Sequence, residues 1–167
     1  ANNYRINTES NLKIKVPKKN MQKANGYISV KKLNIYFNNY LMKNEGPINL
    51  FLTRGKINFS PAKIFGSNDY INFQSVSSNK PIDLKIDGLF RLSLLRLFTP
   101  FLETIEGLAA VNLRVSSDYK DTNFIGSTFI EDTYVRLPAL PHSAESMNID
   151  ILFNQKKIII NSIDGRF

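Results

Sequence analysis

The chain has 167 residues, which is enough for one domain with a sizeable core. It contains no cysteine, which excludes disulfides, thiolate metal sites and cysteine nucleophiles, and it has no run approaching the roughly 20 apolar residues of a membrane helix. Residues 1–66 carry twelve Lys and Arg against two acidic residues, whereas residues 67–167 carry ten against twelve, so the net charge of +8 is uneven. A basic half suits the phosphates of nucleic acid or of lipid head groups, or it is simply a lysine-rich solvated surface.

Short alternating segments of apolar and polar residues fill the first eighty positions and predict β-strands. The first two segments are Tyr4–Ile6 and Leu12–Val16. In Tyr27–Phe37 the apolar parity changes at Lys31 and Lys32, which predicts a β-bulge that keeps both halves facing one way. No segment in the whole chain has convincing helix start and stop signals. Further strands are predicted at residues 48–52, 57–59 and 71–73.

The clearest pattern lies in Pro81–Val115, which predicts two paired strands of a long curved sheet. Alternate residues of each run are apolar, and the outward positions between them, such as Asp83 and Arg114, are hydrophilic. Between the two runs, Leu95–Glu106 loses the alternation and contains Pro100, which predicts a turn with one short helical turn.

Four further strands are predicted at residues 123–131, 134–137, 147–153 and 158–163, so we expect an all-β fold in one domain, residues 1–167. Glycine recurs about every twenty residues, which favours a meandering, solenoid-like sheet over the ordinary turn glycines of a β protein. Several of these glycines end one predicted strand and precede another apolar run. The glycines in this series are Gly26, Gly46, Gly66, Gly88, Gly107, Gly126 and Gly165.

No catalytic or metal-binding motif accompanies these strands. His142 lies in a predicted loop without a triad pattern, and the carboxylate pairs Asp118/Asp121 and Glu131/Asp132 are explained by turn chemistry. We therefore expect no enzymatic activity, no cofactor and no metal.

Nucleic acid is also not expected as a partner. Lys13 and Lys15 alternate with apolar residues, as outward strand positions do. The nearby tyrosines form no stacking platform that would hold bases.

Residues 81–167 resemble the TamB family of AsmA-like envelope proteins. The resemblance is carried by I-D-G-L-F-R-L-S-L-L, by E-G-L-A-A-V-N-L-R-V, by the R-L-P of Arg136–Pro138, and by the closing G-R-F of residues 165–167. It implies a U-shaped apolar trough (a β-taco) in the periplasm that carries phospholipid between the inner and outer membranes. It also implies a longer protein, with an N-terminal helix tethered in the inner membrane and a TamA-like barrel of the Omp85 class as partner.

The trough also follows from the residues themselves, because a sheet with one apolar face must cover it and the sequence supplies no amphipathic helix. A slot about as wide as stacked sheets, roughly 10 Å, would admit acyl chains. Two alternatives stay open: an ordinary closed β core, and a protein-binding scaffold that assists outer-membrane barrel assembly or protein secretion through its strand edges. The predicted lining of the trough is Ile82, Leu84, Ile86, Phe90, Leu92, Leu94, Val111, Leu113, Val115, Met147, Ile149, Ile151, Phe153, Ile158 and Ile160.

Overall fold

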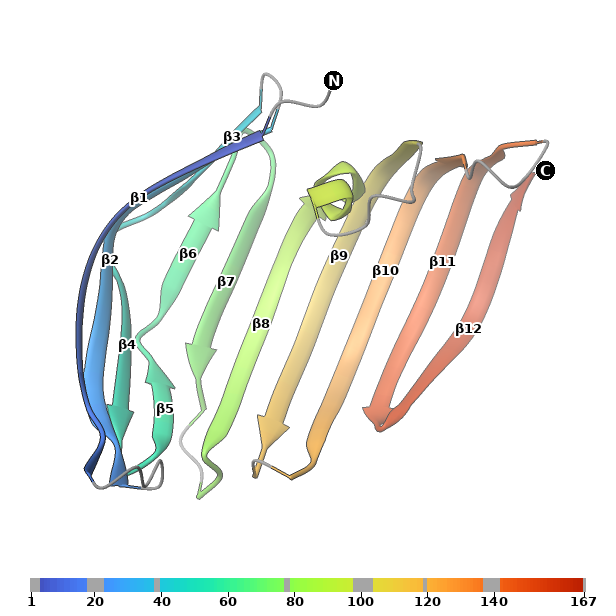
Figure 1. The fold of residues 1–167 in the computed structure, drawn as a ribbon. Helices are drawn as coiled ribbons and strands as arrows, with labels where there is room; N and C mark the ends of the chain where they lie inside the picture. Colours follow the sequence, from blue (N-terminus) through green and yellow to red (C-terminus); the bar gives the residue numbers. More distant parts are fainter. Residues whose placement is uncertain are drawn as a thin grey trace.

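The chain folds into one large, mainly antiparallel sheet of twelve strands, with a short 3-10 helix on one face (Figure 1). This architecture confirms the predicted all-β class. The structure is a computed structural model, and it describes residues 4–17, 23–37, 40–76, 79–97, 104–118, 120–136 and 142–166.

The N-terminal half branches across the width of the sheet. Strand β2 pairs with β1 on one side, and on its other side it pairs with both β3 and β4. One branch continues from β4 to β5 and the other from β3 through β6 to β7, and both branches reach β8. The strands of this half are β1 (Tyr4–Lys15), β2 (Asn25–Phe37), β3 (Tyr40–Asn44), β4 (Ile48–Thr53), β5 (Lys56–Phe59), β6 (Ala62–Phe65) and β7 (Tyr70–Ser75).

The C-terminal half is a simple meander in which β8 to β12 follow one another as antiparallel neighbours (Figure 1). The predicted strand pair in Pro81–Val115 corresponds to β8 and β9, which stay in register from Ile82 opposite Ser117 to Arg91 opposite Leu108. The elements of this half are β8 (Ile82–Arg91), η3 (Leu92–Leu97), β9 (Thr104–Ser117), β10 (Thr122–Arg136), β11 (Ala144–Gln155) and β12 (Lys157–Arg166).

The predicted β-bulge at the paired lysines is confirmed. Glu9 of β1 lies opposite Lys32 of β2, but the next residue, Ser10, lies opposite Val30, so Lys31 is the extra residue. The two segments predicted before it form one continuous strand. The bulge preserves the apolar parity of β2 along its whole length because it shifts the register by one residue.

Several strand boundaries differ from the prediction. Strands β3 and β6 were not predicted, since their four or five residues offer too few alternations to recognise. Residues 123–131 and 134–137 were predicted as separate strands, whereas Thr122–Arg136 is one strand with a bulge between Glu131 and Tyr134. A bulge interrupts the two-residue period without ending the strand, and the sequence pattern cannot distinguish these outcomes.

The recurring glycines do not separate strands as expected. Gly26, Gly88, Gly126 and Gly165 lie inside β2, β8, β10 and β12, whereas Gly46 lies between strands. At Gly126 the reason is a close approach of backbones: φ is 149° and a Cβ would stand 2.0 Å from the Asn112 carbonyl oxygen of β9.

Two clusters of buried apolar side chains lie where η3 covers one end of the sheet. Leu94 packs with Met42 of β3, and Leu92 packs with Ile105 and Ala109 of β9; the exposure of all five is 9% or less. The short helical turn predicted before Glu106 is therefore present, but it begins at Leu92, and residues 98–103 lie outside the described part of the chain. Among the described residues, both clusters of buried apolar side chains thus lie at this end of the sheet, and single buried residues such as Ile48 of β4 and Met147 of β11 are not part of them.

Candidate functional site

One face of the sheet is apolar from edge to edge. In an antiparallel pair, residues directly opposite each other project from the same face, so the strand register identifies which side chains share it. The rows that cross the middle of this face contain no charged residue. The main row consists of Leu12, Ile28, Leu50, Phe59, Phe73, Ile86, Leu113, Gly126, Phe153 and Ile158. We call this surface the apolar face and the other surface the reverse face.

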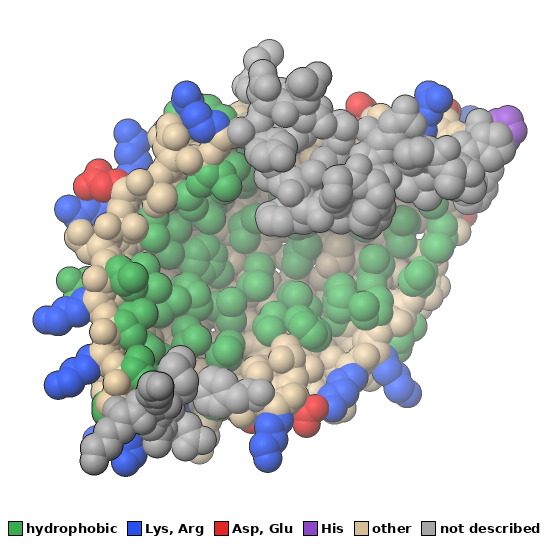
Figure 2. Space-filling view, viewed as in Figure 1, with side chains coloured by type: hydrophobic (Ala, Val, Ile, Leu, Met, Phe, Trp, Pro, Cys, Tyr) green, Lys and Arg blue, Asp and Glu red, His purple; other side chains and the backbone are tan. Residues whose placement is uncertain are grey.

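Figure 2 views the apolar face directly. Apolar side chains gather across the middle of the sheet, and Lys and Arg side chains lie at its periphery. The helix η3 lies on this face, because its buried Leu92 packs against Ala109 and Ile105. Away from η3 most of the side chains in the rows are only half-buried, and at the two edge strands they are exposed: Leu12 is 66% exposed and Ile158 is 70% exposed.

The register brings nearly all of the predicted lining residues onto the apolar face. They come from four strands, and neighbouring strands place them opposite one another, as with Ile86 and Leu113 or Phe153 and Ile158. The predicted residues on this face are Ile82, Leu84, Ile86 and Phe90 of β8, Val111, Leu113 and Val115 of β9, Met147, Ile149, Ile151 and Phe153 of β11, and Ile158 and Ile160 of β12.

The structure places Leu92 and Leu94 differently from the prediction. They were taken as the continuation of the β8 strand, but they belong to η3 and are 2% and 9% exposed. Their side chains cover one end of the apolar face and anchor the helix on it. They are therefore core residues and not part of an open surface.

The prediction also missed part of this face. Strand β10 contributes Phe124 and Ile130, but Ile125 and Phe129 of the same strand project from the reverse face, so the strand shows no clean alternation. The N-terminal half contributes further apolar residues. The alternation of these N-terminal strands was visible in the sequence, but only the strand register shows that their apolar residues continue the apolar face. The residues concerned are Leu12, Ile14, Ile28, Val30, Leu50, Leu52, Ile57, Phe59, Ile64, Ile71 and Phe73.

The reverse face carries the charged pairs that the alternation predicted. Arg114 of β9 donates two hydrogen bonds to the buried carboxylate of Asp83 on β8, at 2.8 and 2.7 Å. The hydrogen bonds and the negative charge of Asp83 raise the pKa of Arg114. Lys80 donates to the hydroxyl of Ser116, the residue opposite Asp83. These contacts tie β8 to β9 on the side away from the apolar face.

The reverse face is less hydrophilic than expected. Tyr70, Leu89, Ala110 and Phe129 form a row across β7 to β10, and Phe129 is 42% exposed. These apolar side chains are interspersed with the charged pairs, so they do not form a surface as extensive as the apolar face.

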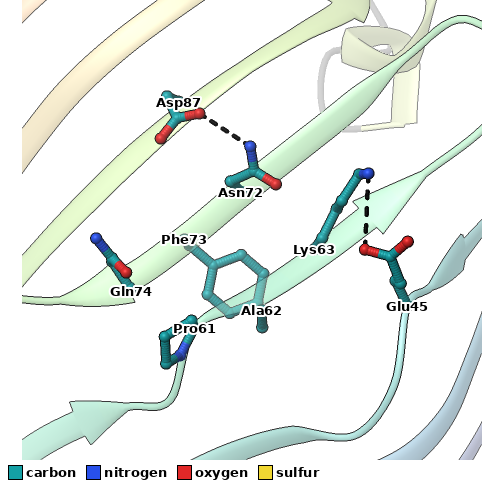
Figure 3. A pocket seen from close by; sticks show the side chains of 8 residues that line it. All are labelled: Glu45, Pro61, Ala62, Lys63, Asn72, Phe73, Gln74 and Asp87. Carbon is teal, nitrogen blue, oxygen red and sulfur yellow. Dashed lines mark hydrogen bonds and ion pairs between the residues drawn. The ribbon is translucent and has the colours of Figure 1, made fainter.

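A pocket of about 400 Å³ lies on the reverse face among β6, β7 and β8 (Figure 3). Its polar groups bind each other: Asn72 donates to Asp87 at 2.9 Å, and the ammonium of Lys63 lies 3.6 Å from the carboxylate of Glu45. The lysine and the asparagine of the lining are therefore already paired with its two acidic residues. Its lining consists of Glu45, Pro61, Ala62, Lys63, Asn72, Phe73, Gln74 and Asp87.

One buried carboxylate joins the two halves of the sheet near η3. Asp69 is 2% exposed, accepts a hydrogen bond from the Tyr40 hydroxyl, and lies 3.4 Å from Arg91 Nε of β8. The Arg91 guanidinium stands 5.2 Å from the centre of the Tyr40 ring. Burial, and then the hydrogen bond and charge of Asp69, raise the pKa of the Tyr40 hydroxyl well above its ordinary value of 10.0. The arrangement holds β3, the β6–β7 connection and β8 together.

The residues considered for catalysis are dispersed in the structure. His142 is exposed and precedes β11, and Asp118 accepts hydrogen bonds from the backbone N–H groups of Lys120 and Asp121, which is turn chemistry. Asp132 lies in the bulge of β10. The described residues contain no group of three or more His, Cys, Asp or Glu that could hold a metal ion.

No protein-family model matches the chain, and no curated protein or solved structure is significantly similar to it. In the part of the chain that the structure describes, no helix has the length and hydropathy needed to cross a membrane.

Proposed function

We propose that this chain is a non-enzymatic lipid-transfer module whose sheet forms an open, U-shaped trough that carries phospholipid acyl chains on its apolar face. The observation that carries the proposal is the uncharged row that crosses the sheet from Leu12 on β1 to Ile158 on β12. Soluble proteins rarely leave a large contiguous apolar surface in water, and such surfaces mark interaction sites.

The exposed area supports an open face over a closed β core. The solvent-accessible surface is 11261 Å², whereas a compact monomer of this mass exposes about 8400 Å². A second layer packed over the whole face would bury its side chains, but within the described residues the clusters of buried apolar side chains lie beneath η3, and most of the remaining face is half-buried or exposed. The apolar face therefore needs an external ligand to cover it.

The distribution of charge favours a lipid over an uncharged hydrophobic ligand. Basic side chains surround the apolar face (Figure 2), and the net charge of the chain is +8. A phospholipid presents apolar tails together with a negatively charged phosphate, so tails on the face and phosphate at its rim would satisfy both features.

The dimensions of the face also suit an acyl chain. The path from β1 through β2, β4, β5 and β8 to β12 crosses eight strand-to-strand steps, or about 38 Å at 4.8 Å per step. One acyl chain spans about half of a bilayer core, roughly 15 Å. Each buried methylene is worth about 0.8 kcal/mol, and this value changes little between neighbouring strands that are equally apolar. A lipid would therefore move along the face without meeting a strand that binds it much more tightly than the next.

The wider setting is proposed from the resemblance to the TamB family. It comprises a periplasmic location, inner-membrane tethering through an N-terminal helix in a longer protein, a TamA-like barrel of the Omp85 class as partner, and a repeat of about twenty residues. The continuous apolar face supports this assignment because a lipid route between two membranes requires an uninterrupted apolar surface.

The unpaired edges of the sheet favour a second candidate, a protein-binding scaffold for barrel assembly or protein secretion. Every described position of β12 is exposed, and β1 pairs only with β2 among the described strands. Free edges can add a strand from a client protein. This candidate uses the backbone of the edges, whereas lipid transfer uses the side chains of the central rows.

Mass spectrometry of lipid extracted from the purified, folded chain tests the proposal. A control β protein purified from the same cells measures non-specific carry-over. We expect phospholipid in near-stoichiometric amount with this chain and only traces with the control. Equal traces in both samples would reject lipid transfer and favour the scaffold.

A further inference from the structure

The apolar face ends, at the β10–β12 side, in a pocket that combines an apolar floor with a cation. Its volume is about 440 Å³, and most of its exposed lining is apolar. It lies at the hairpin between β11 and β12, beside the connection between β9 and β10. The lining residues are Thr122, Phe124, Phe153, Gln155, Lys156, Lys157 and Ile158.

The floor of this pocket belongs to the apolar face. Phe153 lies opposite Ile158 on one side and opposite Gly126 on the other, so the neighbouring position on β10 has no side chain to cover the Phe153 ring. Phe124 is 38% exposed and Ile158 is 70% exposed. These surfaces are in contact with water in the free protein, and a ligand that covered them would gain about 0.8 kcal/mol for each buried methylene.

Lys157 at the start of β12 also lines the pocket, but the cation that borders the β9–β10 connection is Lys156, at the turn of the hairpin. Its ammonium reaches across to the β9–β10 connection and lies 2.5 Å from the Asp121 carboxylate, next to the pocket residue Thr122. Both side chains are more than half exposed, at 64% and 56%. An exposed ion pair is worth little, so an anion in the pocket can replace Asp121 at small cost.

We propose that this pocket is a binding subsite for one acyl chain of an anionic lipid, whose phosphate binds Lys156 in place of Asp121. This subsite deepens the proposed lipid-transfer function and rests on it. It gives the otherwise uniform apolar face one defined position where the head group is recognised by charge. The ion pair with Asp121 competes with the ligand, so the subsite holds its lipid reversibly.

Two amphiphiles that differ only in a phosphate test the subsite: a lysophosphatidic acid and the monoacylglycerol with the same chain. Binding of each is measured below its micelle concentration by isothermal titration calorimetry at constant ionic strength. The variants are Lys156→Gln, Asp121→Asn and, as a control of equal charge change at the opposite edge, Lys13→Gln. All three positions are exposed, and circular dichroism verifies that the variants remain folded.

We expect Lys156→Gln to weaken lysophosphatidic acid binding severalfold, because it removes one exposed charge–charge contact. Asp121→Asn should strengthen the same binding severalfold, since it removes the competing carboxylate. Monoacylglycerol binding should be unchanged in both variants, and Lys13→Gln should leave the binding of both ligands unchanged.

The position of the chain is tested by Ile158→Asp, which should weaken the binding of both amphiphiles. If the wild-type chain binds both amphiphiles but Lys156→Gln acts no more strongly than Lys13→Gln, the subsite is overturned and lipid transfer stands. Unchanged binding in Ile158→Asp would likewise place the acyl chain elsewhere on the face. If the wild-type chain binds neither amphiphile, the proposed function itself fails.

Discussion

Phe59 of β5 and Phe73 of β7 pack edge to face, with ring centres 5.6 Å apart and ring planes at 86°. Their strands are not hydrogen-bonded neighbours in the sheet, because β5 and β7 reach β8 by different branches. The contact, together with the hydrogen bond from the Phe59 N–H to the Ser75 hydroxyl, closes the apolar face at the point where the branches meet.

Phe73→Ala should therefore weaken the packing between β5 and β7, where the two branches meet. The ring is half-buried, so we expect a loss of about 2 kcal/mol in the free energy of unfolding, from lost burial and the lost aromatic pair. Urea denaturation measures it. Tyr70→Ala is a matched control on the same strand, because the Tyr70 ring projects from the reverse face and is exposed. Equal losses in both variants would show that the pair does not join the branches.

Leu113→Arg should abolish lipid binding. Leu113 lies in the middle of the apolar face, opposite both Ile86 and Gly126, and a guanidinium there would lose hydration whenever an acyl chain covered it. We expect co-purified phospholipid to fall about tenfold or more. The control is Asn112→Arg, the adjacent residue on the reverse face, which should retain the lipid. A folded Leu113→Arg variant with full lipid content would contradict the proposed route.

Asp83 should contribute far more to stability than its neighbour on the same face, Asp87. Asp83→Asn removes the charge from two hydrogen bonds with Arg114 at a buried site, and we expect a loss of about 2 kcal/mol in the free energy of unfolding. Asp87 accepts one hydrogen bond from Asn72 and is less buried, so Asp87→Asn should cost less than half as much. Chemical denaturation measures the loss of stability in both variants, and similar losses would show that Asp83 and Asp87 contribute equally.

Gly126→Ala should be much more destabilising than Gly46→Ala. Both glycines have positive φ, of 149° and 74°, but a Cβ at position 126 would meet the Asn112 carbonyl oxygen while a Cβ at position 46 meets nothing within 4 Å. We expect about 1 kcal/mol for Gly46→Ala and about 3 kcal/mol for Gly126→Ala. Thermal unfolding compares the two, and equal shifts in Tm would mean that β9 and β10 can separate without cost.

Ionisation of Tyr40 should destabilise the fold at high pH. Burial and Asp69 raise the pKa of its hydroxyl in the folded state above the unfolded value of 10.0. The neutral form is favoured by folding, so this contribution to stability is complete below pH 10 and is lost as the pH rises toward the folded pKa. Urea denaturation between pH 9 and pH 11.5 should show a decline that is shallower in Tyr40→Phe. Identical declines in stability with pH in the two proteins would show that ionisation of Tyr40 does not destabilise the fold.

The sequence by itself determined the all-β class and the paired strands β8 and β9, because alternation in Pro81–Val115 depends only on the two-residue period of a strand. It also located the bulge at Lys31, since a change of parity without a turn signal has few other structural explanations. The short strands β3 and β6 escaped detection because so few residues cannot establish a period.

Only the tertiary structure decided which alternating segments share a face. Phe73 and Ile86 lie opposite each other, and Phe59 reaches the same row from another branch, because of a pairing order that no local pattern encodes. The tertiary structure likewise placed Leu92 and Leu94 in a covering helix, although their spacing continued the parity of β8. Alternation fixes the face of each strand relative to its own backbone, but the continuity of the apolar face depends on hydrogen bonds between residues distant in the sequence.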